Sequence, residues 1–142
     1  LLTFALREEE GDESMFNFLD RSFNFFDNLE NGYADFHLVF MSQLLCFLGI
    51  FPNIENYSEG AYLDLAQGCI VNEHPLHPNF LMPNDSARFI SMLRIGYESM
   101  HTLSLNRKLR GMYLAIFTEY YRLHVPDFPQ LKSLEILKEL FD

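Results

Sequence analysis

The sequence predicts a mainly α-helical domain of about six helices, packed like a bundle and interrupted by a small, irregular β-hairpin with a proline-rich arm. Apolar residues recur at spacings of three and four over most of the chain, which places them on one face of a helix. Glycine and proline gather between residues 53 and 83, where this periodicity stops. The 142 residues, 49% of them hydrophobic, suffice for a core, so we expect residues 1–142 to form one domain.

The first half of the chain is expected to hold three helices. A short helix over residues 1–9 is followed by an acidic connection, and a second helix covers about residues 14–29. The third, residues 34–48, has the widest apolar surface and is expected at the centre of the bundle, with Cys46 packed inside as a reduced thiol. The residues expected to face the core from the second helix are Met15, Phe16, Leu19, Phe23 and Phe26.

Residues 53–83 are predicted to form the hairpin and the arm. Residues 61–65 and 69–71 have the length of short strands, and Gly68 fits a tight turn between them. The prolines that follow favour an extended segment that crosses the surface, because proline interrupts both helices and ladders.

Helical spacing returns after the arm. A helix over residues 84–95 has Asn84, Asp85 and Ser86 as cap candidates, and a short helical piece is expected at residues 96–102.

The longest predicted helix covers residues 104–123. Its aromatic residues are expected to pack in the core rather than to stack on nucleic-acid bases. Pro126 and Pro129 end this helix, and residues 131–141 are predicted to form a last short one. The residues expected to face the core are Leu105, Leu109, Met112, Tyr113, Ile116, Phe117 and Tyr120.

Charge divides the chain unequally. Residues 1–101 have four basic and fifteen acidic residues, a net charge of −11, whereas residues 102–142 have six basic and five acidic residues, a net charge of +1. Since affinity for nucleic acid comes mainly from cations at the phosphates, the acidic body should bind DNA poorly. Any site for an anionic partner is therefore expected in the last third of the chain.

Several classes of protein are disfavoured by the sequence. It contains no run of about 20 uncharged apolar residues and no secretory signal pattern, so we expect no membrane association and a cytoplasmic location. The motifs G-x-S-x-G, H-E-x-x-H and the Walker glycine loop are absent, so we expect no enzyme and no cofactor. Because the chain begins with Leu1 rather than Met, we expect that a preceding domain is missing.

Three stretches together resemble the C-terminal part of RecO, a bacterial recombination mediator. These are FHLVFMSQLLCFLGIFPNI (36–54), YLDLAQGCI (62–70) and the ending from Tyr113 to Phe141, with its helix, its prolines and Leu-Lys-Ser. The resemblance implies a preceding OB-type barrel, which would contact most of the single-stranded DNA. It also implies a role in RecF-type DNA repair and recombination. Such a protein binds RecR and the tail of single-stranded DNA-binding protein, helps to load recombinase and anneals strands, without catalysis, and is associated with the nucleoid during repair.

The sequence departs from this family at the hairpin. Many RecO proteins hold zinc there with two pairs of cysteines, and a structural zinc site needs four ligands. Here Cys69 is the one cysteine in the region, with His74 and His77 as further weak candidates, and C-x-x-C is absent. We therefore expect a metal-free hairpin.

A cluster of basic residues is the candidate partner-binding site. Arg107, Lys108 and Arg110 lie at the start of the longest helix, and Arg122 and Lys132 are candidates to complete the site from neighbouring segments. The resemblance to RecO implies that the ligand is an acidic peptide ending in Phe. A site for such a peptide needs cations around an apolar pocket. The alternative interpretation of the cluster is a solvated helix start. An alternative function for the whole chain is a helical regulatory or sensor domain with an enclosed apolar pocket for a small hydrophobic ligand.

Overall fold

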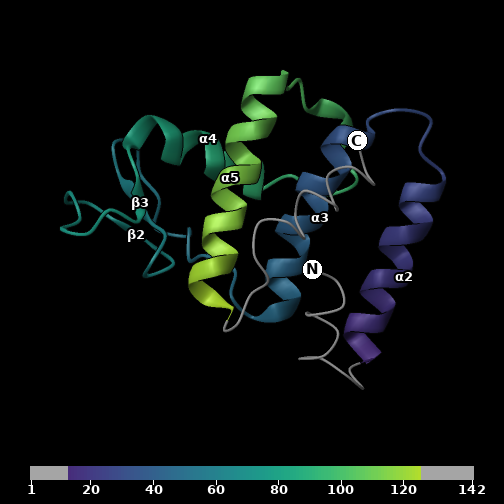
Figure 1. Ribbon diagram of the computed structural model, residues 1–142, viewed down its shortest axis with the longest axis horizontal. Helices are drawn as coiled ribbons and strands as arrows, with labels where there is room; N and C mark the ends of the chain where they lie inside the picture. The colour runs from purple at the N-terminus through teal and green to yellow at the C-terminus, as the bar shows by residue number, and fades with distance from the viewer. Residues whose placement is uncertain (1–12, 126–142) are drawn as a thin grey trace.

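The computed structural model describes residues 13–125 and shows a mainly helical molecule with a small sheet at one end. In Figure 1, α2, α3 and α5 follow one another across the molecule, and the sheet with α4 lies beyond α5. The elements are α2 (Glu13–Asp27), α3 (Tyr33–Leu48), β1 (Tyr62–Asp64), β2 (Cys69–Val71), β3 (Phe80–Leu81), α4 (Pro83–Leu93), the 3-10 helix η1 (Met100–Thr102) and α5 (Arg107–His124). The mainly α class and the hairpin are confirmed. The helices predicted at 1–9 and 131–141 lie outside the described residues, so the total of about six stays a prediction.

Helix α3 occupies the centre, as its wide apolar surface predicts. It packs against α2, α4, α5 and η1. Cys46 is an exception to the prediction, because it is exposed rather than buried. The fully buried apolar side chains of α3 are Phe36, Leu38, Val39, Phe40, Met41, Leu44 and Leu45.

Helix α2 packs on α3 with a face that matches the predicted one only in part: Leu19 is buried and Phe26 packs against Phe36 with 5.0 Å between ring centroids, as predicted. Phe18 is buried, and its ring stacks on that of Phe47 with 4.4 Å between centroids. Phe16 and Phe23, which we expected in the core, are 70% and 39% exposed. The helix has apolar residues on two overlapping faces. The buried one includes Ser22, whose hydroxyl accepts a hydrogen bond from the hydroxyl of Tyr97 at 2.8 Å. Leu19 is buried as predicted, and the side chain of Met15 lies outside the described side chains.

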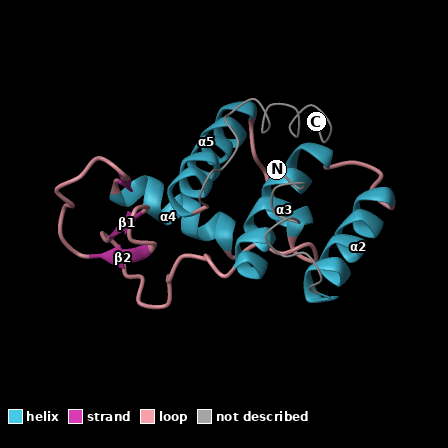
Figure 2. Ribbon diagram, turned by 60° about the horizontal axis from the view of Figure 1, so that its bottom comes forward, coloured by secondary structure: helices cyan, strands magenta, loops and turns pink. Residues whose placement is uncertain are grey.

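The hairpin contains one more strand than the sequence predicted. Strands β1 and β2 pair antiparallel around a turn in which Gly68 adopts a φ of +68°, and β3 pairs with the other edge of β1. Figure 2 shows the long loop between β2 and β3, which is the predicted proline-rich arm. Its end returns to β1 as a two-residue strand, too short for any sequence periodicity to reveal. The sheet is attached to α5 by His124, whose Nε2 donates to the carbonyl of Leu65 at 2.6 Å.

Helix α4 begins at Pro83 and not at a polar cap residue. Proline suits the first helical turn because its nitrogen needs no hydrogen-bond partner there. The predicted caps Asn84, Asp85 and Ser86 therefore lie inside the helix. Ser86 instead joins the helix to the sheet: its buried hydroxyl accepts a hydrogen bond from Leu63 N–H at 2.8 Å and donates one to the carbonyl of Leu81 at 2.9 Å.

Residues between α4 and α5 form turns and the short helix η1, where a longer helical piece was expected. Helix α5 then crosses α3, and Tyr121, which is fully buried, donates a hydrogen bond to the carbonyl of Met41 at 2.7 Å. The aromatic residues of α5 thus belong to the core, as predicted, and the half-buried Leu105, Leu109 and Met112 pack against its edge. In residues 13–125, no helix combines the length and the apolar composition needed to span a membrane.

We predict that Ser86→Ala lowers the free energy of unfolding by about 1–3 kcal/mol, because it leaves the Leu63 N–H and the Leu81 carbonyl without their partner in a buried place. Ser91→Ala on the same helix is the matched control. Its hydroxyl is exposed and bonds only to Ala87 of its own helix, so about zero change is expected. Urea unfolding measures both, and equal losses in the two variants would contradict the proposed link.

Candidate partner-binding site

The start of α5 presents two exposed cations. Asn106 caps the helix, since its side-chain oxygen accepts a hydrogen bond from Leu109 N–H at 2.8 Å. Arg107 and Lys108 follow in the first turn, both exposed, and this turn contains no Asp or Glu. The N-terminal end of a helix has a partial positive charge, which favours acidic side chains there. Two cations at this place lower helix stability and produce a locally positive surface suited to an anionic partner.

Arg110, the third basic residue of the cluster, already has hydrogen-bond partners. Its Nε donates to Asp35 Oδ1 at 3.2 Å, and its Nη2 donates to the carbonyl of Leu105 at 3.0 Å. This ion pair is partly buried and joins the start of α5 to the start of α3. Arg110 therefore helps to hold the start of α5, which carries Arg107 and Lys108, in place on α3, and its own charge is already paired with Asp35.

Arg122 is far from this cluster. It lies fifteen residues beyond Arg107 on the same helix, which at 1.5 Å per residue is about 22 Å along the axis. Both its Nε and its Nη2 donate to the carboxylate of Glu119, and this lowers the pKa of Glu119 and raises that of Arg122. Lys132 lies outside the described residues. The structure thus brings Arg107 and Lys108 together, with Arg110 beside them, and places Arg122 at the opposite end.

The weak metal candidates do not form a ligand set. Among residues 13–125, the structure brings no three His, Cys, Asp or Glu side chains into a group that could hold a metal ion. The Nδ1 of His74 donates to the carbonyl of Pro75 at 2.8 Å. Cys69 lies on β2, where burial and then the charge of Asp64 raise the pKa of its thiol, which disfavours the thiolate that zinc requires. These residues do not fit the zinc site of the family.

A pair of side chains holds the hairpin instead. Asp64 is nearly buried and accepts two hydrogen bonds, from Gln67 N–H at 2.9 Å and from His77 Nε2 at 2.9 Å. His77 Nδ1 accepts one from Asn79 N–H at 3.0 Å, so its Nε2 carries the proton that it donates. Asp64 and His77 therefore fix the turn and the arm from one point.

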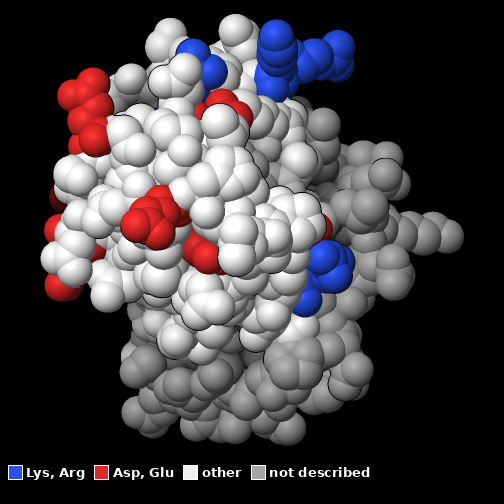
Figure 3. All heavy atoms as spheres, turned by 90° about the vertical axis from the view of Figure 1, so that its left-hand side faces the viewer, with Lys and Arg blue, Asp and Glu red and all other residues white. Residues whose placement is uncertain are grey.

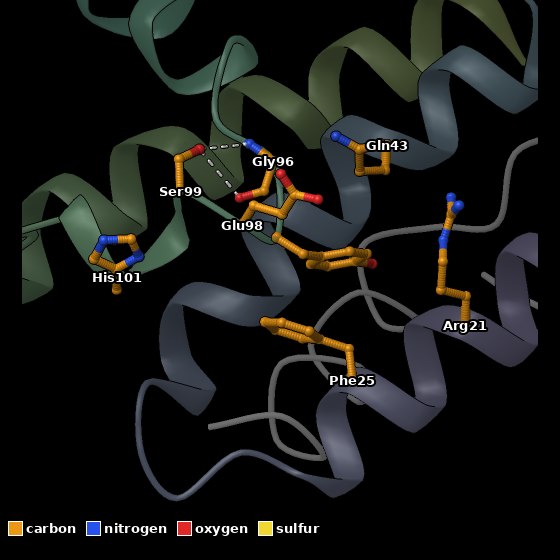
Figure 4. Close-up of a pocket in the computed structure, with 8 residues that line it drawn as sticks. Arg21, Phe25, Gln43, Gly96, Glu98, Ser99 and His101 are labelled. Carbon is orange, nitrogen blue, oxygen red and sulfur yellow. Dashed lines mark hydrogen bonds between the residues drawn. The ribbon is translucent and has the colours of Figure 1, made fainter.

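A groove that the sequence did not reveal lies between α2, α3 and the segment before η1. It has a volume of about 660 Å³ and opens to the surface. Figure 4 shows Arg21 and Phe25 reaching toward it from α2 and Gln43 from α3. Its floor includes the stacked rings of Phe25 and Tyr97, 4.7 Å apart, and burial raises the pKa of Tyr97 to about 12. No spacing in the sequence could signal this groove, because its walls come from segments about 20 and 50 residues apart.

The groove differs from the enclosed apolar pocket that a sensor of hydrophobic ligands would need. Arg21, Gln43, Glu98 and His101 line it beside the two rings. A second cavity of about 460 Å³ shares part of this lining and also opens to the surface. Open, mixed polar grooves bury little of a small apolar ligand, so no cavity described here favours that alternative.

We predict that His77→Ala loosens the hairpin while a metal chelator does not. The substitution removes one of the two hydrogen-bond donors to Asp64 and the acceptor of Asn79 N–H. Hydrogen exchange at Asn79, and at Gln67, which donates to Asp64, should therefore accelerate about tenfold or more. His74→Ala is the control, because its ring donates a hydrogen bond to the adjacent Pro75 carbonyl and contacts Tyr62 and Phe80, and its loss leaves the hydrogen bonds of Gln67 N–H and Asn79 N–H in place. A shift of the unfolding midpoint on addition of EDTA would contradict the metal-free account.

Comparison with known proteins agrees with the early resemblance. The family model described as Recombination protein O C terminal matches residues 1–135. The DNA repair protein RecO of Phocaeicola vulgatus is 44% identical over 137 residues, which are 96% of this chain and 57% of that protein. The RecO of Bacteroides fragilis is 43% identical over 139 residues, 97% of this chain and 57% of that protein.

The similarity extends to more distant relatives. The RecO of Flavobacterium psychrophilum is 29% identical over 141 residues, which are 99% of this chain and 58% of that protein. No solved structure gives a significant match. The chain spans less than two thirds of the length of the curated relatives it matches. On the family model and these identities, the chain belongs to the RecO family of DNA repair proteins and corresponds to its C-terminal part.

Proposed function

We propose that this chain is the helical part of a recombination mediator of the RecF-type pathway. It binds the C-terminal tail of single-stranded DNA-binding protein and RecR, and so helps to load recombinase and to anneal strands. The role is binding without turnover, in the cytoplasm and at the nucleoid during repair. Family membership supports the DNA repair role, and the particular partners are the proposal.

The observation that carries the proposal is the pair of exposed cations at the start of α5. Arg107 and Lys108 are exposed, stand at the positive end of a helix and have no acidic neighbour in their turn. This arrangement costs helix stability, so it is explained better by an anionic ligand than by folding. An acidic peptide with a terminal carboxylate supplies the matching charge, and the half-buried Leu105 and Leu109 beside the pair supply apolar surface for its Phe.

Single-stranded DNA would be contacted mainly by the OB-type barrel that precedes this part in the family. Residues 13–125 have seven basic and twelve acidic residues, an unfavourable balance for phosphate. A barrel of that type suits single strands because it offers stacking platforms beside basic grooves. The helical part then binds the protein partners, while the barrel binds the single-stranded DNA.

We predict that the double variant Arg107→Glu with Lys108→Glu binds the tail peptide at least tenfold more weakly, yet unfolds at equal or higher denaturant concentration. Reversing the charges removes the attraction for the peptide and complements the helix end, which is worth roughly 0.3–1 kcal/mol per residue. Fluorescence titration with a labelled acidic peptide ending in Phe measures the affinity, and urea unfolding measures the stability.

Arg122→Glu is the matched control on the same helix. It makes the same reversal of charge about 22 Å away, and it breaks the ion pair with Glu119. Its affinity for the peptide should equal that of the unchanged protein. If the double variant keeps full affinity, or if Arg122→Glu weakens binding equally, the peptide does not bind at the start of α5.

A further inference from the structure

The outer side of the small sheet carries an aromatic and apolar surface. Side chains alternate along a strand, and Leu63 is buried in the core whereas Tyr62 before it is half-buried on the other side of the sheet. The outward rings contact one another: His74 lies 4.7 Å from Phe80 and 5.5 Å from Tyr62, between centroids. We define the hairpin face as Tyr62, Val71, His74, Leu76 and Phe80, all exposed or half-buried.

Leu76 stands at the tip of the arm with its side chain fully in solvent, at 106% of the reference exposure. The arm around it is nevertheless held firmly. His77 is anchored to Asp64, His74 donates to the carbonyl of Pro75, and Pro75 and Pro78 restrict the backbone on both sides. A rigid loop that presents an apolar side chain loses little conformational entropy when a partner encloses it.

The segment that forms the hairpin has acidic residues and no Lys or Arg. No Lys or Arg occurs from residue 22 to residue 87, the stretch that forms the hairpin and its approach. Glu55, Glu59 and Glu73 are exposed within it. Figure 3 looks at the side of the molecule where the sheet lies and shows acidic groups among neutral surface, with Lys and Arg at the top of the view and in one further group right of its centre. Such a surface repels phosphate and attracts a basic protein surface.

We propose that the hairpin face is a docking surface for a protein whose matching surface has an apolar pocket for Leu76 bordered by Lys and Arg. The apolar tip gives affinity, and the acidic surroundings give orientation and a faster encounter. This interaction is separate from the peptide site at the start of α5, so both partners are bound at once. The match of charge also distinguishes the partner from DNA and from a second copy of this chain.

The test uses the complete protein with a photo-crosslinking amino acid at position 76, expressed in its own host. The partner cross-linked there is identified, purified and titrated against the protein. We expect its cross-linked surface to be basic and its affinity to fall as the salt concentration rises. Absence of a protein cross-link, a cross-link to DNA, or an acidic partner surface would each overturn the proposal.

The decisive variant is Leu76→Asp, which should weaken the binding of that partner at least tenfold. Phe16→Asp on α2 is the matched control, because it places the same charge on another exposed apolar residue and should leave the affinity unchanged. Both sites are exposed, so both variants should fold, and urea unfolding checks this. Affinity for the acidic tail peptide should be equal in the two variants, which keeps this result independent of the site on α5. Unchanged affinity in Leu76→Asp would overturn the proposal.

Discussion

Helix α3 buries apolar side chains around most of its circumference, and the other long helices of residues 13–125 take their positions from it. Removing a large side chain from such a centre leaves a cavity that costs about 2–5 kcal/mol. Polar links reinforce the packing, since Tyr121 and Ser42 both join α3 to other helices through buried hydrogen bonds. The ion pair of Asp35 with Arg110 extends the same attachment to the surface, so the geometry of the candidate site depends on the central helix.

The predictions succeeded where one physical signal decides and failed where two compete. The centre of the bundle followed from the apolar breadth of residues 34–48, and the turn followed from Gly68. The face of α2 followed only in part, because phenylalanines occupy two overlapping stripes: Leu19 and Phe26 pack in the core as predicted, whereas Phe16 and Phe23 are exposed. Contacts with distant partners show which stripe is buried: the ring of Phe47 stacks on Phe18, and the Tyr97 hydroxyl donates to Ser22. The start of α4 differs from the prediction because a proline fits both the end of an extended arm and the first turn of a helix, and Pro83 begins the helix.

The candidate site was predicted only in part, because the sequence does not show which distant residues its side chains contact. Sequence spacing identified the basic cluster, but it could not show that Arg110 is engaged by Asp35, 75 residues away. Nor could composition separate Arg107 from Arg122, which lie near opposite ends of the same helix. Asp64 and His77 were invisible as a pair, since nothing local links residues thirteen positions apart. Long-range pairing is the information that one sequence lacks.

Lys108 has a consequence that reaches beyond binding. It is the sole lysine among residues 13–125. Acetylation within the stretch would therefore act at one place, where it would neutralise one of two neighbouring charges and leave Arg107 alone. Acylation of lysine, whether by a cellular acetyltransferase or by an amine-reactive dye, thus reports on the start of α5 and on no other point in residues 13–125.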